Sequence, residues 1–238
     1  TAVGLLPLAV AGVDIDALLA GAREESAAVV DFIDAEQSDH DSSIFAIAEN
    51  IFRYAAFRHI MRDRGYNVEV LSSFEPDMRK FSDWWKQLFG ESEGKDNQGI
   101  FPASMTFTTD LHALSQYLQQ GLPNVFETVI KFNSLDNPDI SVPEMSDNLD
   151  SLDYLEGKTL ADLNQKALHA IIKAHSKHLP VVELGVPDLS ERSLGSLIYF
   201  FELACAVSAT LQGVNPFDQP GVEVYKQEMF KIFGKPGY

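Results

Sequence analysis

A hexapeptide in the first half of the chain places two carboxylates and an amine around two glycines. It reads Gly-Glu-Ser-Glu-Gly-Lys, spans residues 90–95 and directly follows a predicted helix. A carboxyl group beside the negative end of a helix has a raised pKa, a property of general bases that work near neutral pH. Glu91 and Glu93 are therefore candidate bases, although spacing alone favours a hydrophilic turn with solvated charges. The run is not a phosphate-binding P-loop, because Asp96 follows Lys95 where that motif requires Ser or Thr.

A second candidate is the imidazole of His112 in the run Thr-Thr-Asp-Leu-His, residues 108–112. A strand is predicted before it, and Asp110 is predicted to cap a helix over 111–120 that ends before Gly121. The positive end of a helix favours the neutral imidazole, which can exchange protons. A histidine alone on a helix is more often structural or solvated, so that alternative stays open.

A third candidate is Lys226, near the start of a predicted helix over 222–233. The helix follows a loop rich in turn-forming residues, 213–221. A cation in the first turns of a helix opposes the helix dipole, and a residue set against a local preference suggests a use elsewhere. The alternative is a solvated surface lysine.

Composition limits the partners of this chain. Its 238 residues suffice for one large domain or two small ones, and 45% of them are apolar. The formal net charge of −17 argues against non-specific nucleic-acid binding and against docking on an anionic membrane. A small anionic substrate stays possible, because helix N-termini and a few cations can attract it locally.

The remaining signals point to a cytoplasmic protein without a metal. Cys205 is the single cysteine, which excludes an internal disulfide, and a buried inert thiol is expected. No segment has enough continuous apolar residues to cross a bilayer. His169, His175 and His178 share one predicted helical region. A metal at His175 and His178 is conceivable, but no carboxylate or cysteine accompanies them at ligand spacing, so solvated side chains are favoured.

Hydrophobic periodicity predicts an α/β fold. Strands are predicted over 66–72, 100–108, 124–132 and 179–184, and helices over 15–32, 42–64, 76–90, 111–120, 160–177, 190–212 and 222–233. Residues 133–153 are predicted to form a polar surface loop that contains one short strand at 140–142. Because strands alternate with helices, we expect a mostly parallel sheet covered on both faces, with sites at the C-terminal ends of its strands.

The three candidate segments together resemble the phosphoglucose isomerase (glucose-6-phosphate isomerase) family, bacterial type. Its motifs W-x-x-Q-L-F-G-E-S-E-G-K, [ST]-T-D-L-H-x-[LM]-x-Q-Y and Q-x-G-V-E-x-x-K match this chain in order and at compatible spacing. The resemblance assigns the catalytic base to Glu91, with Gln87 beside it. It assigns the catalytic histidine to His112, and it places Gln219 and Lys226 in the active site.

The resemblance implies the interconversion of glucose 6-phosphate and fructose 6-phosphate in glycolysis and gluconeogenesis, without metal or cofactor. His112 would assist ring opening with Lys226 at the ring oxygen, and Glu91 would move a proton between C2 and C1 through a cis-enediol. It further implies a three-layer αβα sugar-isomerase (SIS-like) domain with C-terminal helices. The family works as a homodimer in which the histidine comes from the partner subunit.

The resemblance covers about the C-terminal half of a bacterial family member. We therefore expect a helical segment over 1–45 that packs on a missing upstream half. The SIS-like domain would span 46–212, and 213–238 would form the loop and helix that carry Lys226. The family's active-site arginine and phosphate-binding loop would lie upstream, so we expect little or no activity from this piece alone. The alternative function is a non-catalytic sugar-phosphate-binding module on the same fold.

Overall fold

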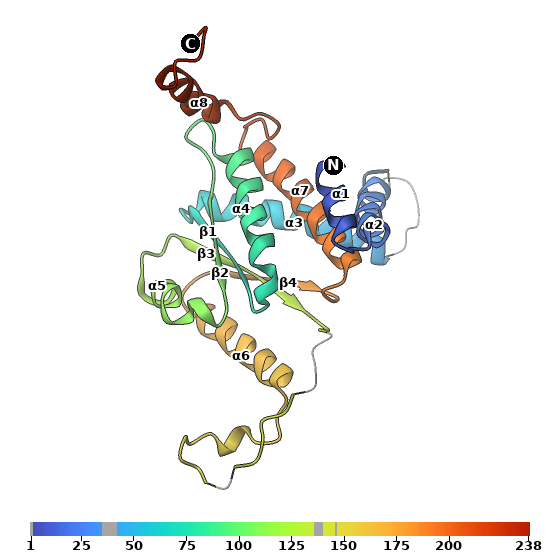
Figure 1. Cartoon of the computed structure of the whole chain (residues 1–238), viewed down its shortest axis with the longest axis vertical. Helices are drawn as coiled ribbons and strands as arrows, with labels where there is room; N and C mark the ends of the chain where they lie inside the picture. The colour runs from blue at the N-terminus through green and yellow to red at the C-terminus, as the bar shows by residue number, and fades with distance from the viewer. Residues whose placement is uncertain (1, 35–41, 136–139, 146) are drawn as a thin grey trace.

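The structure is a computed structural model that describes residues 2–34, 42–135, 140–145 and 147–238, with only the backbone for 42–47. Its centre is a sheet of parallel strands in the order β2-β1-β3-β4 (Figure 1). The strands are β1 Val68–Ser73, β2 Phe101–Thr106, β3 Val125–Phe132 and β4 Val181–Val186. The predicted α/β class and parallel sheet are confirmed.

Helices precede, connect and follow these strands. The α-helices are α1 Ala2–Val10, α2 Ile15–Asp34, α3 Ser42–Asp63, α4 Arg79–Glu93, α5 Leu114–Gln120, α6 Leu160–His175, α7 Glu191–Leu211 and α8 Pro220–Ile232. Short 3₁₀ helices lie at η2 Pro76–Met78, η3 Thr109–His112 and η4 Asp153–Leu155. Most predicted elements agree with these to within a few residues.

Alternating side chains of the strands pack into two separate hydrophobic cores, one on each face of the sheet. Leu71 and Ile130 point to one face of the sheet, where they pack in a cluster with residues of α3, α4 and α7. Val70 and Val129 point to the other face and pack against α5 and α6. Because successive strand residues face opposite sides, this alternation produces three layers, helix–sheet–helix.

A close helix crossing joins α2 to α7. A Cβ atom added to Gly21 would lie 1.9 Å from the carbonyl oxygen of Arg192, and one added to Gly195 would lie 1.9 Å from that of Leu18. The two backbones can therefore touch only because both positions are glycine. Thus α2 packs within the chain; the expected boundaries at residues 45 and 212 stay a prediction.

Three local predictions are wrong. The helix predicted to end at Gly90 continues to Glu93, so Glu91 lies within its last turn. The helix predicted over 111–120 is split into η3 and α5 at Ala113, and Asp110 accepts a hydrogen bond from the backbone N–H of Thr106 instead of capping α5. The predicted strand at 140–142 is only a single bridge between Ser141 and Thr159; residues 136–139 and 146 of that surface loop lie outside the described residues.

Helix α7 is long and hydrophobic enough to cross a membrane by length and composition. The expectation that no such segment exists was therefore too strong. Core helices pass the same test, and α7 packs against α2, α3 and α4 with its Phe201, Ala204 and Cys205 buried. These contacts fit a core helix.

Candidate active site

Glu91 is held by two amide side chains from distant parts of the chain. The Gln87 amide, one turn earlier on α4, donates to Glu91 Oε1 at 2.9 Å. The Gln219 amide, immediately before α8, donates to the other carboxylate oxygen. The structure thus brings together three of the five predicted site residues. Both carboxylate oxygens are oriented by donors, while Glu91 is only half-buried and open to a ligand.

Lys95 fastens the loop that carries Gln219. Its ammonium group lies 3.0 Å from Asp218 Oδ1 and donates to the backbone carbonyl of Asn215, and its side chain is 8% exposed. The hydrogen bond from Lys95 is also the main cause of the lowered pKa of Asp218. Lys95 therefore fixes the 213–219 loop on the end of α4.

Glu93, the other candidate base of the hexapeptide, is fully buried and has a structural partner. Arg58 of α3 donates to its Oε2 at 2.6 Å and also forms an ion pair with Glu69 of β1. Tyr54 and Thr128 each donate to Glu69 at 2.6 Å, and burial raises the pKa of Tyr54 to about 12. This buried network anchors the end of α4 beneath Glu91, so Glu93 is not available as a base.

His112 and Glu91 lie at opposite ends of the strands, His112 at the C-terminal end of β2 and Glu91 near its N-terminal end. Helix α4 leads back to the edge where β2 begins, since a Cβ at Gly90 would lie 3.7 Å from Pro102. His112 is exposed on η3, which follows the C-terminal end of β2, and a strand of six residues spans roughly 17 Å. The expectation that the sites share the C-terminal edge is wrong for Glu91. Within one chain the two side chains are not brought together.

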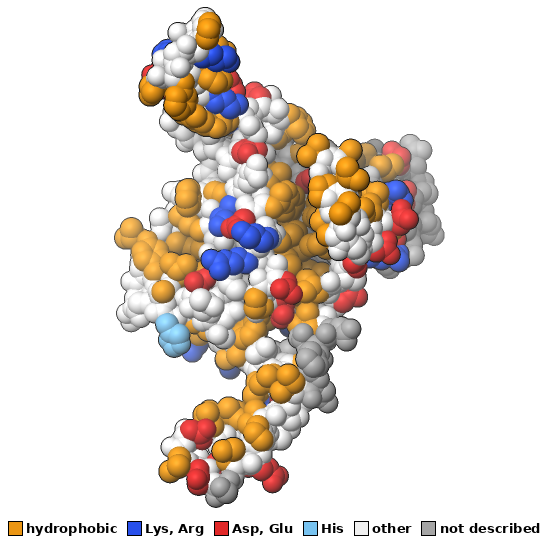
Figure 2. Space-filling view, in the orientation of Figure 1, with side chains coloured by type: hydrophobic (Ala, Val, Ile, Leu, Met, Phe, Trp, Pro, Cys, Tyr) orange, Lys and Arg blue, Asp and Glu red, His pale blue; other side chains and the backbone are white. Residues whose placement is uncertain are grey.

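Lys226 is not among the described hydrogen-bond partners of Glu91. Its ammonium group pairs with Glu223 Oε1 at 2.7 Å on the same helix, and that hydrogen bond raises the pKa of Lys226, so the side chain is cationic. Helix α8 projects from the body of the molecule beyond the end of α4 (Figure 1). Its apolar side chains are exposed (Figure 2): Val224, Tyr225, Met229 and Ile232.

His175, expected to be solvated, is 1% exposed and hydrogen-bonded on both ring nitrogens. Its partners are Ser115 and Glu127, which lie 60 and 48 positions away along the chain. Because they are so remote in sequence, ligand spacing around the histidines could not reveal them. Among the described residues, no three His, Cys, Asp or Glu side chains cluster as a metal site.

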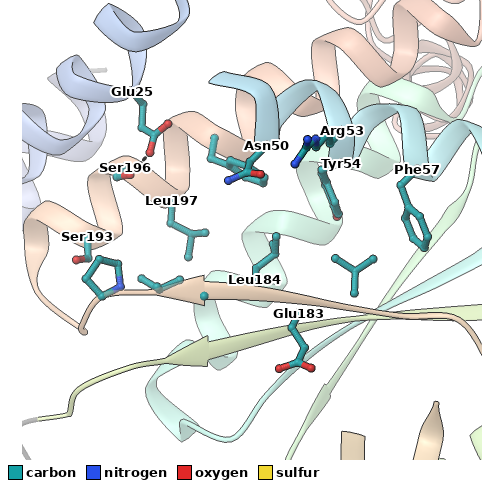
Figure 3. A pocket seen from close by; sticks show the side chains of 15 residues that line it. Glu25, Asn50, Arg53, Tyr54, Phe57, Glu183, Leu184, Ser193, Ser196 and Leu197 are labelled. Carbon is teal, nitrogen blue, oxygen red and sulfur yellow. Dashed lines mark hydrogen bonds between the residues drawn. The ribbon is translucent and has the colours of Figure 1, made fainter. Parts of the chain in front are cut away.

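A cavity of about 560 Å³ lies between α3, α7 and β4 (Figure 3). Tyr54, Leu184 and Leu197 contribute to its largely apolar lining, and Glu25 accepts a hydrogen bond from Ser196 at one side. Burial is the main cause of the raised pKa of Glu25. No predicted site residue lines this cavity, so it is separate from the Glu91 cluster.

Comparison with known proteins identifies the class. The sequence model of the family described as phosphoglucose isomerase matches residues 35–236, and the chain belongs to that family. The chain is 49% identical to a glucose-6-phosphate isomerase of Lactobacillus helveticus and 48% identical to that of Limosilactobacillus reuteri. All of this chain is covered in both comparisons, but it spans 51% and 50% of the lengths of those two proteins.

Solved structures agree with the fold. A hypothetical protein of Thermus thermophilus superposes with a TM-score of 0.82 at 28% identity, covering 98% of this chain and 54% of that one. A glucose-6-phosphate isomerase of Chlamydia trachomatis superposes with a TM-score of 0.59 at 23% identity, covering 71% of this chain and 35% of that one. The second likeness supports the fold alone.

Proposed function

We propose that this chain supplies the proton-transfer half of an aldose–ketose isomerase that interconverts glucose 6-phosphate and fructose 6-phosphate. The observation that carries the proposal is the Glu91 carboxylate, which is oriented by Gln87 and Gln219 and open to a ligand. Membership in the phosphoglucose isomerase family and the isomerases at 48–49% identity support it.

In the proposed reaction Glu91 removes the proton from C2 of the open-chain aldose. The electron pair forms a C1–C2 double bond while the C1 carbonyl oxygen takes up a proton, which gives a cis-enediol. The protonated Glu91 then returns its proton to C1 while the C2 hydroxyl gives up its own proton, which leaves a ketone at C2. A positioned general base of this kind contributes roughly 10²–10⁴-fold in rate. His112 would assist ring opening, and Lys226 would stabilise charge on the ring oxygen.

We infer that the complete site forms between two copies of the chain. His112 and Glu91 lie at opposite ends of the strands, so a single copy cannot present both to one small sugar. A homodimer in which the partner subunit contributes the histidine satisfies the requirement. Cytoplasmic localisation, and the absence of nucleic-acid or membrane partners, are part of the same proposal.

The substitution Glu91→Gln tests the proposal in the complete gene product. The amide keeps the shape and size of the side chain but cannot accept the C2 proton, so we expect kcat to fall by roughly 10²–10⁴-fold in a coupled assay. The affinity for fructose 6-phosphate should change by less than about threefold, or roughly 0.7 kcal/mol. A wild-type protein that binds the sugar phosphate without turnover would instead identify a non-catalytic binding module.

We also propose that the 238-residue chain alone has little isomerase activity. Because it spans about half the length of its relatives, groups that bind the phosphate are expected elsewhere in the complete protein. The same coupled assay on both proteins tests this. Turnover by the chain alone at the rate of the complete gene product would refute it.

A further inference from the structure

A line of buried hydrogen bonds crosses one face of the sheet. Ser72 of β1 donates to Glu127 Oε1 at 2.6 Å, and the other oxygen of Glu127 on β3 lies 2.7 Å from His175 Nδ1. His175 Nε2 lies 2.5 Å from the hydroxyl of Ser115 on α5. Ser72, Glu127 and His175 are at most 1% exposed. Two strands, α6 and α5 are thereby tied through one imidazole.

The imidazole of His175 contacts the chain on both sides of His112. The rings of His175 and Phe107 form a T-shaped contact, with a centroid distance of 6.2 Å and an interplanar angle of 65°. Phe107 follows β2 directly and is 2% exposed, whereas Ser115 lies in the first turn of α5. His175 therefore holds the two ends of the short segment that presents His112.

Besides His175, the segment is held by the hydrogen bond from Thr106 N–H to Asp110, by a backbone hydrogen bond from Phe107 to Ser73 and by the ring contact between Phe74 and Phe107. Its α5 end has fewer attachments. Ala113 interrupts it with φ −123° and ψ −80°, and α5 has no side-chain cap. Leu118 is the one buried residue of α5. A two-turn helix with so few buried residues depends on side-chain attachments for its position.

We propose that His175 is a positioning residue that places His112 through Ser115 and Phe107, with Glu127 fixing the orientation of its ring. The inference rests on the proposed function, because it gives His112 a catalytic role. In the neutral ring Nδ1–H donates to Glu127, and Nε2 accepts a hydrogen bond from the hydroxyl of Ser115. Since a displacement of about 1 Å can cost 10²-fold in rate, a fixed segment matters for a proton-transfer group.

The order hydroxyl–imidazole–carboxylate is also that of acyl-transfer enzymes. Here the imidazole is 1% exposed, and both of its nitrogens already bind the protein. It therefore has no free face for a substrate, which favours positioning over nucleophilic catalysis.

A double-mutant cycle in the complete gene product tests the proposal. Ser115→Ala should lower kcat about 3- to 30-fold with KM within about twofold, and Ser115→Thr, which keeps a hydroxyl, should recover most of the loss. In a His112→Ala background the same Ser115→Ala change should cost less than about twofold, because the group it positions is gone. An equal loss in both backgrounds would overturn the proposal, and so would ester hydrolysis that depends on Ser115.

Gln120→Ala is the matched control. It removes a surface hydrogen bond of the same helix, that between the amides of Gln116 and Gln120 at 2.9 Å, and should leave kcat unchanged. In the 238-residue chain, amide exchange over residues 107–115 should rise at least about tenfold in Ser115→Ala and not in Gln120→Ala. If Ser115→Ala left amide exchange over residues 107–115 unchanged, the hydrogen bond between Ser115 and His175 would not fix this segment, and the proposal would be overturned. An inactive wild-type gene product would overturn the isomerase function instead, with this exchange difference still measurable.

Discussion

Glu91 and Gln219 share a hydrogen bond although they lie 128 positions apart in the sequence. Gln219 immediately precedes α8, and its loop is fastened to α4 by Lys95. The carboxylate is therefore oriented from two sides, by its own helix and by the last loop of the chain.

Removal of that second support should slow proton transfer. Gln219→Ala leaves Glu91 with the single donor Gln87, and a hydrogen bond to a charged group contributes about 1.5–3 kcal/mol. We expect kcat of the complete gene product to fall by about 10-fold or more, as measured by the coupled assay. Glu228→Gln, which breaks only the surface ion pair with Lys231, is the control and should have no effect. Equal activity of Gln219→Ala and the control would show that the contact does not serve the reaction.

Substitution of Glu93 should lower the stability of the chain, whereas substitution of Glu91 should not. Glu93→Gln leaves the buried guanidinium of Arg58 without one of its two carboxylate partners, and breaking a buried pair costs about 3–5 kcal/mol. Glu91→Gln, two residues earlier, should change the free energy of unfolding by less than about 0.5 kcal/mol. Urea denaturation of the 238-residue chain measures both. Similar midpoints for the two variants would contradict the structural role of Glu93.

The single thiol should be unreactive in the folded protein. Cys205 is 1% exposed, and burial raises its pKa to about 12. At pH 8 its thiolate fraction is then about 10⁻⁴, whereas an unfolded cysteine with a pKa of about 8.5 is roughly one-quarter ionised. Ellman's reagent at pH 8 should label it only after denaturant is added. Rapid labelling of the native chain would show that this part of α7 is open.

The same pKa difference sets a direction for stability against pH. The folded protein binds the thiol proton more tightly than the unfolded chain does. The Cys205 thiol therefore contributes its full share to the free energy of unfolding below its unfolded-state pKa. This stabilisation is lost as the pH rises from about 9 towards 12.

Much of the fold was readable from local patterns. Helical periodicity and turn residues placed α2, α3, α6 and α7 to within a few residues, because one apolar face and two ends define each helix. The hexapeptide was also found. Its two glutamates are chemically alike in the sequence, however, because only the packing of α4 on α7 and the ion pair with Arg58 bury Glu93 and leave Glu91 accessible.

What the sequence did not reveal depends on distant partners. Arg58 meets Glu93 from 35 positions away, and His175 meets Glu127 from 48. Periodicity within a helix says which face is buried but not which buried carboxylate that face will meet. The placement of Glu91 and His112 at opposite ends of the strands follows from the direction of α4 relative to β2, which becomes visible once the strands are assembled.

The crossing of α2 and α7 gives a stability test with a built-in control. A methyl group at Gly195 would overlap the backbone carbonyl of Leu18, so Gly195→Ala should cost about 1–3 kcal/mol. A methyl group at Gly185 in β4 would meet open space, with nothing within 4 Å, and Gly185→Ala should change the stability by less than about 0.5 kcal/mol. Thermal unfolding of both variants measures the difference. Equal melting temperatures would show that the two helices can move apart at no cost.

The reciprocal contact at Gly21 and Gly195 also restricts how the gene can drift. Every missense change in a glycine codon introduces a residue with a Cβ atom, and at each of these two sites that atom would fall on the carbonyl of the opposite helix. A compensating change at one site cannot relieve the other, because each glycine meets backbone and not a side chain. Among descendants of this gene, both codons should therefore accumulate amino-acid changes more slowly than the exposed positions of α2.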